Sequence, residues 1–288
     1  MSDPAWGDWI WENRDKISLG LAALYRWLRS DSDIDQGHSP ADEKPGILVL
    51  GPGGVGKSTL GKILSGRLDP FGGLVGDYLE DVDVQSFPLD DASGVEVLVA
   101  PGQQHRRGTW NDELTKLAAG KYRGMILLSA YGYHNHEIGY MASYKDHRLY
   151  KGDKDKFLEA FLHDRQNEEL AVLQKLSPHV QPPAGGKFWL LTLVTKQDLW
   201  WEDRAAAETF YTAGAYAAEI AKIQSHHGEQ LFRHELALAS LVISNFRTGK
   251  GEVLKPNAAG YDQDYHVRSL RNLIGTLEAL RRWEVHND

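Results

Sequence analysis

The residues whose types and spacing most clearly carry chemistry form a glycine-rich octapeptide, Gly51-Pro52-Gly53-Gly54-Val55-Gly56-Lys57-Ser58. It matches the G-x-x-x-x-G-K-[ST] pattern, in which glycines let backbone N–H groups turn inward around phosphate. The N-terminus of a following helix adds partial positive charge there. Lys57 is predicted to contact the β- and γ-phosphates of a nucleotide, and the Ser58 hydroxyl to bind Mg²⁺. The predicted phosphate-binding residues are Gly51, Gly53, Gly54, Val55, Gly56, Lys57, Ser58 and Thr59.

The pattern predicts phosphate binding only where a strand precedes it and a helix follows it. Residues 47–50 are a short apolar run that predicts a strand, and residues 57–68 have helical spacing. The alternative, a glycine-rich turn with an exposed Lys57, does not need these flanking elements.

A second polar segment, Thr195-Lys196-Gln197-Asp198, follows an apolar run at 188–194. Together with the phosphate-binding pattern it resembles the [NT]-K-x-D motif of the Ras-like small GTPases. The resemblance implies that the Asp198 carboxylate accepts hydrogen bonds from guanine and that the Lys196 stem stacks along the base. Adenine presents the opposite donor and acceptor pattern at that edge. The expected ligands are GTP or GDP with Mg²⁺; the alternative is a solvated strand end.

A third segment, Ala100-Pro101-Gly102-Gln103, follows the alternating apolar run at 95–99. It resembles the D-x-x-G-Q of switch II in small GTPases, and more closely the P-G-Q form of bacterial polarity-switch GTPases of the MglA type. The resemblance implies that the Gly102 N–H contacts the γ-phosphate and that Gln103 orients the attacking water. Lys57 and Gln103 are therefore the catalytic candidates.

The chain departs from the small-GTPase pattern in two places that bear on hydrolysis. Val99 stands where the family usually has its Mg²⁺-linked aspartate, and no threonine occurs between Thr59 and Thr109 to act as the switch I threonine. These departures favour nucleotide binding over fast hydrolysis. The residues that can substitute for the threonine are Asp77, Asp81, Asp83 and Ser86.

Two further segments have weaker motif matches. Ser244-Asn245 resembles the S-A segment whose backbone contacts the guanine O6 in small GTPases. Arg106 and Arg107 follow Gln103, where an arginine can stabilise transition-state charge, although a solvated or partner-binding role is the simpler interpretation.

Histidine and carboxylate side chains at His134, His136 and Glu137 are of the types that bind zinc. Their spacing on an extended segment favours an ordinary surface loop instead. The charges at 154–165 are interpreted as a solvated helix face, and His226-His227 as surface residues.

The apolar runs predict an α/β fold with a mainly parallel sheet of the P-loop NTPase kind and helices on both faces. The turn-like residues 90–94 join a β-hairpin formed by 81–88 and 94–100. Further strands are predicted at 124–130, 188–194 and 236–244, and long helices at 154–176, 204–230 and 264–285.

The chain divides into three predicted parts. Residues 1–29 have an amphipathic helical pattern rich in tryptophan, residues 30–45 read as an acidic linker, and residues 46–288 form the small-GTPase-like domain. The N-terminal helix is expected to dock on the main domain or on a partner, with an interfacial membrane helix as the alternative. Insertions near 131–186 and 200–235 are the expected partner surfaces.

Composition limits the classes of function. The 288 residues carry a formal net charge of −8, which argues against nucleic acid as the main ligand. Zero cysteines fit a reducing cytoplasm, and no uninterrupted apolar run is long enough for a transmembrane helix, although peripheral membrane contact remains open.

The sequence therefore supports three hypotheses. The first is a GTP-dependent switch with slow hydrolysis, acting on a protein partner through its switch segments, its insertions or its N-terminal helix. The second is a nucleotide-binding interaction module with little or no turnover. The third is an ATP-dependent P-loop phosphotransferase, which leaves the segment 195–198 unexplained.

Overall fold

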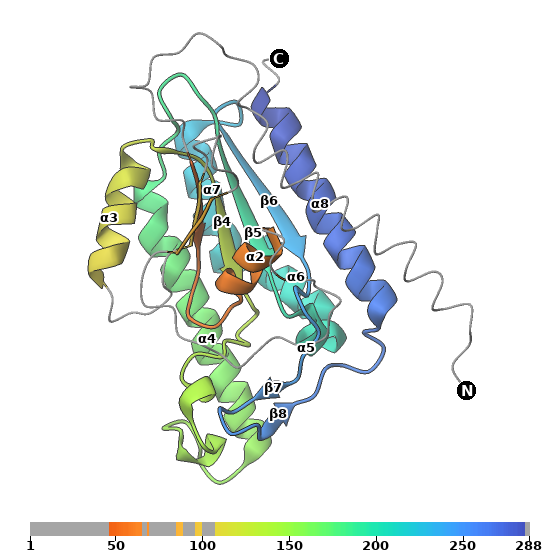
Figure 1. The fold of residues 1–288 in the computed structure, drawn as a ribbon. Coiled ribbons are helices and arrows are strands. Elements are labelled where there is room, and N and C mark those ends of the chain that lie inside the picture. Colours follow the sequence, from red (N-terminus) through yellow and green to blue (C-terminus); the bar gives the residue numbers. More distant parts are fainter. Residues whose placement is uncertain (1–45, 65–67, 69–84, 89–95, 100–106, 286–288) are drawn as a thin grey trace.

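The computed structural model describes residues 46–64, 68, 85–88, 96–99 and 107–285 (Figure 1). The predicted N-terminal helix, the linker, and Gly102, Gln103 and Arg106 lie outside these ranges. Among the helices in the described ranges, none combines the length and the apolar character needed to cross a membrane.

A six-stranded sheet forms the centre of the molecule, with strand order β2-β3-β1-β4-β5-β6. Strand β2 is antiparallel to β3, and all the other neighbouring pairs are parallel. Strands β4 and β5 are buried along their whole length, which explains their continuous apolar sequence. The strands are β1 (Gly46–Leu50), β2 (Gln85–Pro88), β3 (Glu96–Val99), β4 (Tyr122–Ser129), β5 (Phe188–Val194) and β6 (Phe232–Leu238).

Helices cover both faces of this sheet. In Figure 1, α3 and α4 lie on one side of it and α8 on the other, packed along β6 and β5. This arrangement confirms the predicted α/β class with a mainly parallel sheet. The α-helices are α2 (Lys57–Leu64), α3 (Arg107–Ala118), α4 (Lys154–Leu176), α5 (Gln197–Trp200), α6 (Arg204–Thr212), α7 (Gly214–His227) and α8 (Gln263–Val285). Short 3₁₀ helices are η1 (Ile138–Tyr140), η2 (Tyr144–Asp146), η3 (Ser177–His179) and η4 (Trp201–Asp203), and β7 (Phe246–Arg247) pairs with β8 (Val253–Lys255).

Helix α4 has the predicted bounds because its ends carry clear signals. The Asp153 side chain accepts a hydrogen bond from the Lys156 N–H at 2.9 Å, which caps the first turn. Phe157 and Phe161 begin a buried face that continues to the last residue of the helix. The same face also buries two charged side chains, those of Arg165 and Glu169.

The last strand of the sheet begins and ends earlier than predicted. Strand β6 covers Phe232–Leu238 instead of 236–244, because its parallel register pairs Phe188 with Phe232 and Val194 with Leu238. The apolar residues beyond Leu238 leave the sheet, and this turn places Ser240 near the end of β5.

One predicted helix is divided in the structure. The stretch at 204–230 is divided into α6 and α7, because Ala213 is extended and Gly214 has a left-handed φ of 69°. Helix α2 covers Lys57–Leu64; residues 65–67 of the predicted helix lie outside the described ranges, and Leu68 is not helical.

The sheet topology places the motifs together. From β1 the chain passes to β2 and β3 on one side of that strand, and then crosses to β4 on its other side. Ligands of open α/β sheets bind in the crevice at the carboxyl ends of the strands, where the order reverses in this way. Residues 51–58 follow β1, and residues 195–198 follow β5, at this same edge of the sheet.

Replacing Gly124 with alanine is expected to destabilise the sheet, because the new methyl carbon would lie 2.1 Å from the Trp189 ring. Overpacking of this kind typically costs about 1–3 kcal/mol in the free energy of unfolding. The matched control is Gly275→Ala on α8, where nothing lies within 4 Å of the added carbon. There alanine should stabilise by up to ~1 kcal/mol, since glycine is a poor helix former. Urea denaturation measures both, and equal stability of the two variants would contradict this packing.

Candidate functional site

The loop after β1 has a backbone that requires glycine. Gly51, Gly54 and Gly56 have φ angles of 147°, 76° and 101°, which L side chains rarely adopt. A Cβ atom on Gly51 would also lie 2.3 Å from the carbonyl oxygen of Leu128 in β4. Residues 51–58, called the phosphate-binding loop after their predicted role, therefore form a tightly turned loop against the neighbouring strand.

Lys57 begins α2 and has only 7% of its surface exposed. Its Nζ donates to the carbonyl oxygens of Gly51 at 3.0 Å and Pro52 at 2.8 Å. The ammonium group thus lies across the opening of the loop, and Ser58 follows it in the first turn of the helix.

Thr195 joins the ends of three segments. Its hydroxyl oxygen lies 2.7 Å from the carbonyl oxygen of Val55 and 2.9 Å from that of Ser129. Its own N–H donates to Ser129 at 2.8 Å. Val55 belongs to the loop after β1, and Ser129 ends β4, so one buried side chain connects the phosphate-binding loop to β4 and β5.

Lys196 has a left-handed φ of 57°, a conformation that costs a non-glycine residue about 1–3 kcal/mol unless its surroundings hold it. Its Nζ donates to the Tyr133 carbonyl at 2.5 Å and to Asn135 Oδ1 at 2.7 Å. Burial lowers the pKa of Lys196 to about 7, although Asp198 and Glu169 oppose the shift.

Asp198 is 1% exposed, and both of its carboxylate oxygens accept hydrogen bonds. The Ser240 hydroxyl donates to Oδ1 at 2.5 Å, and the Ser244 N–H donates to Oδ2 at 3.0 Å. The Asp198 N–H donates back to Ser240 Oγ at 2.8 Å. Burial raises the pKa of Asp198, against the effect of these donors and of Lys196.

Ser240 is a site residue that sequence reasoning missed. The sequence predicts a role for Ser244-Asn245 instead. In the structure Ser244 donates its backbone N–H to Asp198, and the Asn245 side chain accepts from the Asn257 N–H at 3.0 Å. A small hydroxyl residue just after a strand can indicate such a role. Because the predicted strand runs from 236 to 244, Ser240 falls inside it, and only the observed end of β6 at Leu238 places Ser240 after the strand.

Residues 130–137, termed here the β4 loop, pack directly on the phosphate-binding loop. The Asn135 N–H donates to the Gly54 carbonyl at 3.3 Å. A Cβ atom on Gly54 would lie 2.6 Å from the Asn135 nitrogen, and one on Gly53 would lie 2.9 Å from the His136 ring. This contact therefore requires glycine at two positions of the loop that the sequence pattern itself leaves variable.

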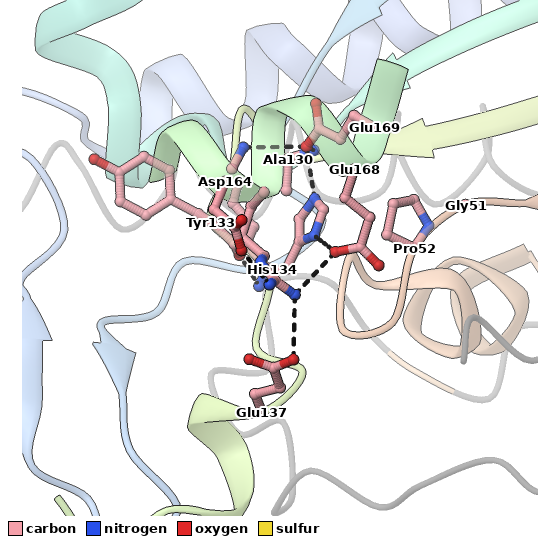
Figure 2. A network of polar contacts seen from close by, with 12 residues as sticks. Gly51, Pro52, Ala130, Tyr133, His134, Glu137, Asp164, Glu168 and Glu169 are labelled. Carbon is pink, nitrogen blue, oxygen red and sulfur yellow. Dashed lines mark hydrogen bonds and ion pairs between the residues drawn. The ribbon is translucent and has the colours of Figure 1, made fainter. Parts of the chain in front are cut away.

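The surface-loop prediction for His134 is wrong. His134 is fully buried, with Nε2 2.7 Å from Glu169 Oε1 and Nδ1 3.6 Å from Glu168 Oε2 (Figure 2). Although burial opposes it, these two carboxylates raise the pKa of His134. Within the described ranges, no group of three or more metal-binding side chains is found.

The prediction of a wholly solvated charged face at 154–165 is also wrong at its end. Arg165 is buried, and its guanidinium contacts Asp164 at 2.5 Å and Glu168 at 2.9 Å. Helix packing turns this position toward the β4 loop. His227 of the pair His226-His227 is partly buried and lies 2.9 Å from the Val180 carbonyl oxygen.

The residues predicted to act on the γ-phosphate fall largely outside the described ranges. Gly102, Gln103 and Arg106 all lie outside these ranges. Arg107 is the first residue of α3. Val99 ends β3 and pairs with Val49 of β1, so an apolar residue does stand at the strand end beside the phosphate-binding loop.

Comparisons with known proteins give only distant neighbours. No protein-family model matches the sequence, and no curated protein matches it. Among solved structures, the signal recognition particle receptor SRb in an SRb-GTP/SRX complex from Chaetomium thermophilum is 14% identical. That match covers 79% of this chain and 98% of the neighbour, with a TM-score of 0.40. SRb-GDP from the same organism is 15% identical, and the match covers 79% of this chain and 99% of the neighbour, with a TM-score of 0.35. At these scores the functional assignment depends on the site itself.

Ser240→Ala is expected to lower the free energy of unfolding by about 1–3 kcal/mol, because it leaves a buried carboxylate and N–H of Asp198 without their partner. Ser244→Ala is the control, since Ser244 serves Asp198 through its backbone, and an exposed substitution of this kind stays within about 0.5 kcal/mol. Chemical denaturation compares the two. A Ser240→Ala protein as stable as the Ser244→Ala protein would contradict the proposed anchoring.

The free energy of unfolding is expected to increase with pH above neutrality because of Lys196. Its proton leaves the folded protein near pH 7 but leaves the unfolded chain near 10.5, so the unfolded state binds more protons between these values. One proton contributes at most about 1.4 kcal/mol per pH unit. Denaturation at pH 7, 8 and 9 should show the free energy of unfolding increasing more steeply with pH in the wild type than in Lys196→Met. Parallel slopes would show that the Lys196 ammonium is not desolvated.

Proposed function

We propose that this chain binds GTP and GDP, with phosphates held at residues 51–58 and guanine held at residues 195–198. The single observation that carries the proposal is the hydrogen bond from the Thr195 hydroxyl to the Val55 carbonyl. It joins a phosphate-binding loop to the strand end that carries a buried aspartate and a lysine. A chance occurrence of the two sequence patterns would not require them to touch.

The phosphate half of the proposal follows from the groups that converge on the loop. Lys57 Nζ is held by two neutral carbonyl oxygens, which phosphate oxygens can replace with charged acceptors. The N-terminus of α2 adds partial positive charge at the same place. Mg²⁺ typically keeps several waters and binds one or two protein ligands plus substrate phosphates, so a single hydroxyl, that of Ser58, fits this ion.

The base half depends on how Asp198 is held. Ser240 and the Ser244 N–H orient the carboxylate, and Lys196 lies two residues away on the same turn. Guanine offers two N–H donors to a carboxylate, whereas adenine offers an acceptor at the corresponding ring nitrogen. A buried carboxylate left facing that acceptor would lose hydrogen bonds, which is the physical basis for preferring guanine.

We further propose slow hydrolysis and a switch function. Gln103 would orient water for in-line attack on the γ-phosphate, while Lys57 stabilises charge in the transition state. Val99 at the end of β3 argues against rapid turnover, and this observation supports the alternative of a binding module with little hydrolysis. In either case a protein partner would bind through the segments 71–88 and 102–110, the insertions or the N-terminal segment.

Calorimetric titration of nucleotide-stripped protein with GTP and ATP analogues plus Mg²⁺ tests the proposal. GTP is expected to bind in preference to ATP. Asp198→Asn should weaken GTP binding roughly ten- to a hundredfold, because a hydrogen bond to a charged group contributes about 1.5–3 kcal/mol. Asp112→Asn, on the exposed face of α3, is the matched control and should leave binding unchanged.

Equal binding of GTP and ATP, or preference for ATP, would reject the guanine assignment and favour the phosphotransferase alternative. If GTP binds tightly, phosphate release under single-turnover conditions then separates a slow GTPase from a binding module. A Gln103→Leu variant that releases phosphate as fast as the wild type would remove Gln103 from the mechanism.

A further inference from the structure

We propose that Glu169 of α4 is a positioning residue for the phosphate-binding loop and acts through the β4 loop. What the positioned loop binds rests on the proposed function above, whereas the positioning itself rests on contacts in the structure. Glu169 is only 1% exposed, so its carboxylate is satisfied entirely by protein groups.

Three successive backbone N–H groups of the β4 loop donate hydrogen bonds to Glu169 or to its partner Tyr211. Ala130 and Gly132 donate to Glu169 Oε1 at 2.9 Å and 3.1 Å. Tyr131 donates to the Tyr211 hydroxyl oxygen at 3.0 Å, and that hydroxyl donates to Glu169 Oε2. One carboxylate thus organises a backbone segment that lies more than 30 positions away in the sequence.

The backbone held in this way is one that the chain would not adopt by itself. Tyr131 and Gly132 have left-handed φ angles of 48° and 85°, and successive N–H groups in such a conformation form a concavity suited to an anion. A Cβ atom on Gly132 would lie 2.5 Å from the Leu162 carbonyl oxygen, so the segment is pressed against α4. The carboxylate therefore helps to offset the cost of the unusual conformation at Tyr131, through Tyr211 and the two flanking N–H groups.

Glu169 also fixes the next polar residue of the loop. Its Oε1 lies 2.7 Å from His134 Nε2, and Glu168 approaches the other ring nitrogen at 3.6 Å. Arg165 donates to Glu168 at 2.9 Å and lies 3.7 Å from Glu137, so the contacts reach both ends of the loop (Figure 2). Because its imidazole is held between two carboxylates, His134 fixes the position of the next residue in the chain, Asn135.

From Asn135 the effect passes directly to the nucleotide site. The Asn135 N–H donates to the Gly54 carbonyl, and its side chain accepts from Lys196. Gly53 and Gly54 are packed so closely on His136 and Asn135 that no Cβ atom fits between them. A shift of the β4 loop therefore moves the phosphate-binding loop and releases Lys196 at the same time.

The test is hydrogen exchange of the nucleotide-free full chain, comparing the wild type with Glu169→Gln and Tyr211→Phe. The amide can accept from some of the loop donors but cannot replace both carboxylate oxygens. Exchange of peptides covering residues 51–58 is expected to become roughly tenfold faster in Glu169→Gln, equivalent to losing about one net hydrogen bond. Tyr211→Phe keeps its ring contacts and should show a smaller increase.

Glu219→Gln on α7 is the matched control, because Glu219 is also buried but pairs with Lys222 away from the β4 loop. It should leave exchange at 51–58 unchanged. Faster exchange confined to 130–137, with 51–58 protected as in the wild type, would overturn the proposal. If Glu169→Gln does not fold, the same comparison of peptides in Tyr211→Phe decides it.

A second readout separates this inference from the proposed function. Dissociation of a fluorescent GDP analogue should accelerate in Glu169→Gln by the same factor as exchange at 51–58, with the cooperativity of unfolding retained. An unchanged dissociation rate would overturn the positioning role in the functional state. If the wild type binds no guanine nucleotide, the proposed function fails, and the exchange measurement still decides whether Glu169 positions the loop.

Discussion

The hydrogen bond between the Thr195 hydroxyl and the Val55 carbonyl is the contact on which the rest of the site depends. At the carboxyl ends of β1, β4 and β5 the strands stop pairing, and their buried backbone groups need other partners. Here the loops satisfy one another: Thr195 contacts Val55 and Ser129, and Asn135 contacts Gly54. The shape of the phosphate-binding loop is therefore set jointly by segments that lie far apart in the sequence.

The same edge of the sheet concentrates buried charge. Lys57, Lys196, Asp198, Glu169 and His134 all have partners, as they must, because an unpaired buried ion is strongly destabilising. Burial shifts the pKa of Lys196 downward and that of Asp198 upward. Shifted pKa values gather at functional sites, because holding charge ready for a ligand is costly for the folded protein. The acidic net charge of the whole chain does not predict the two lysines, Lys57 and Lys196, at this edge.

Much of the fold was predictable from the sequence because its apolar patterns are long and regular. The strand at 188–194 and the helix at 154–176 have the predicted bounds. Where the patterns were ambiguous the predictions failed: β6 lies earlier than expected, and Gly214 divides a predicted helix. Periodicity cannot tell whether an apolar residue pairs in a sheet or covers its edge, so the predicted strand includes Leu241, which lies beyond the observed end of β6.

By itself the sequence determined the phosphate-binding pattern, the strand and helix around it, and the polar residues Thr195, Lys196 and Asp198, because these signals are local. Only the tertiary structure decided that Ser240 anchors Asp198 and that Glu169 of α4 is buried against His134 of the β4 loop. These partners are 42 and 35 positions apart in the sequence. A charged residue on a helix looks the same in a sequence whether it faces water or a buried backbone, and packing alone selects between the two.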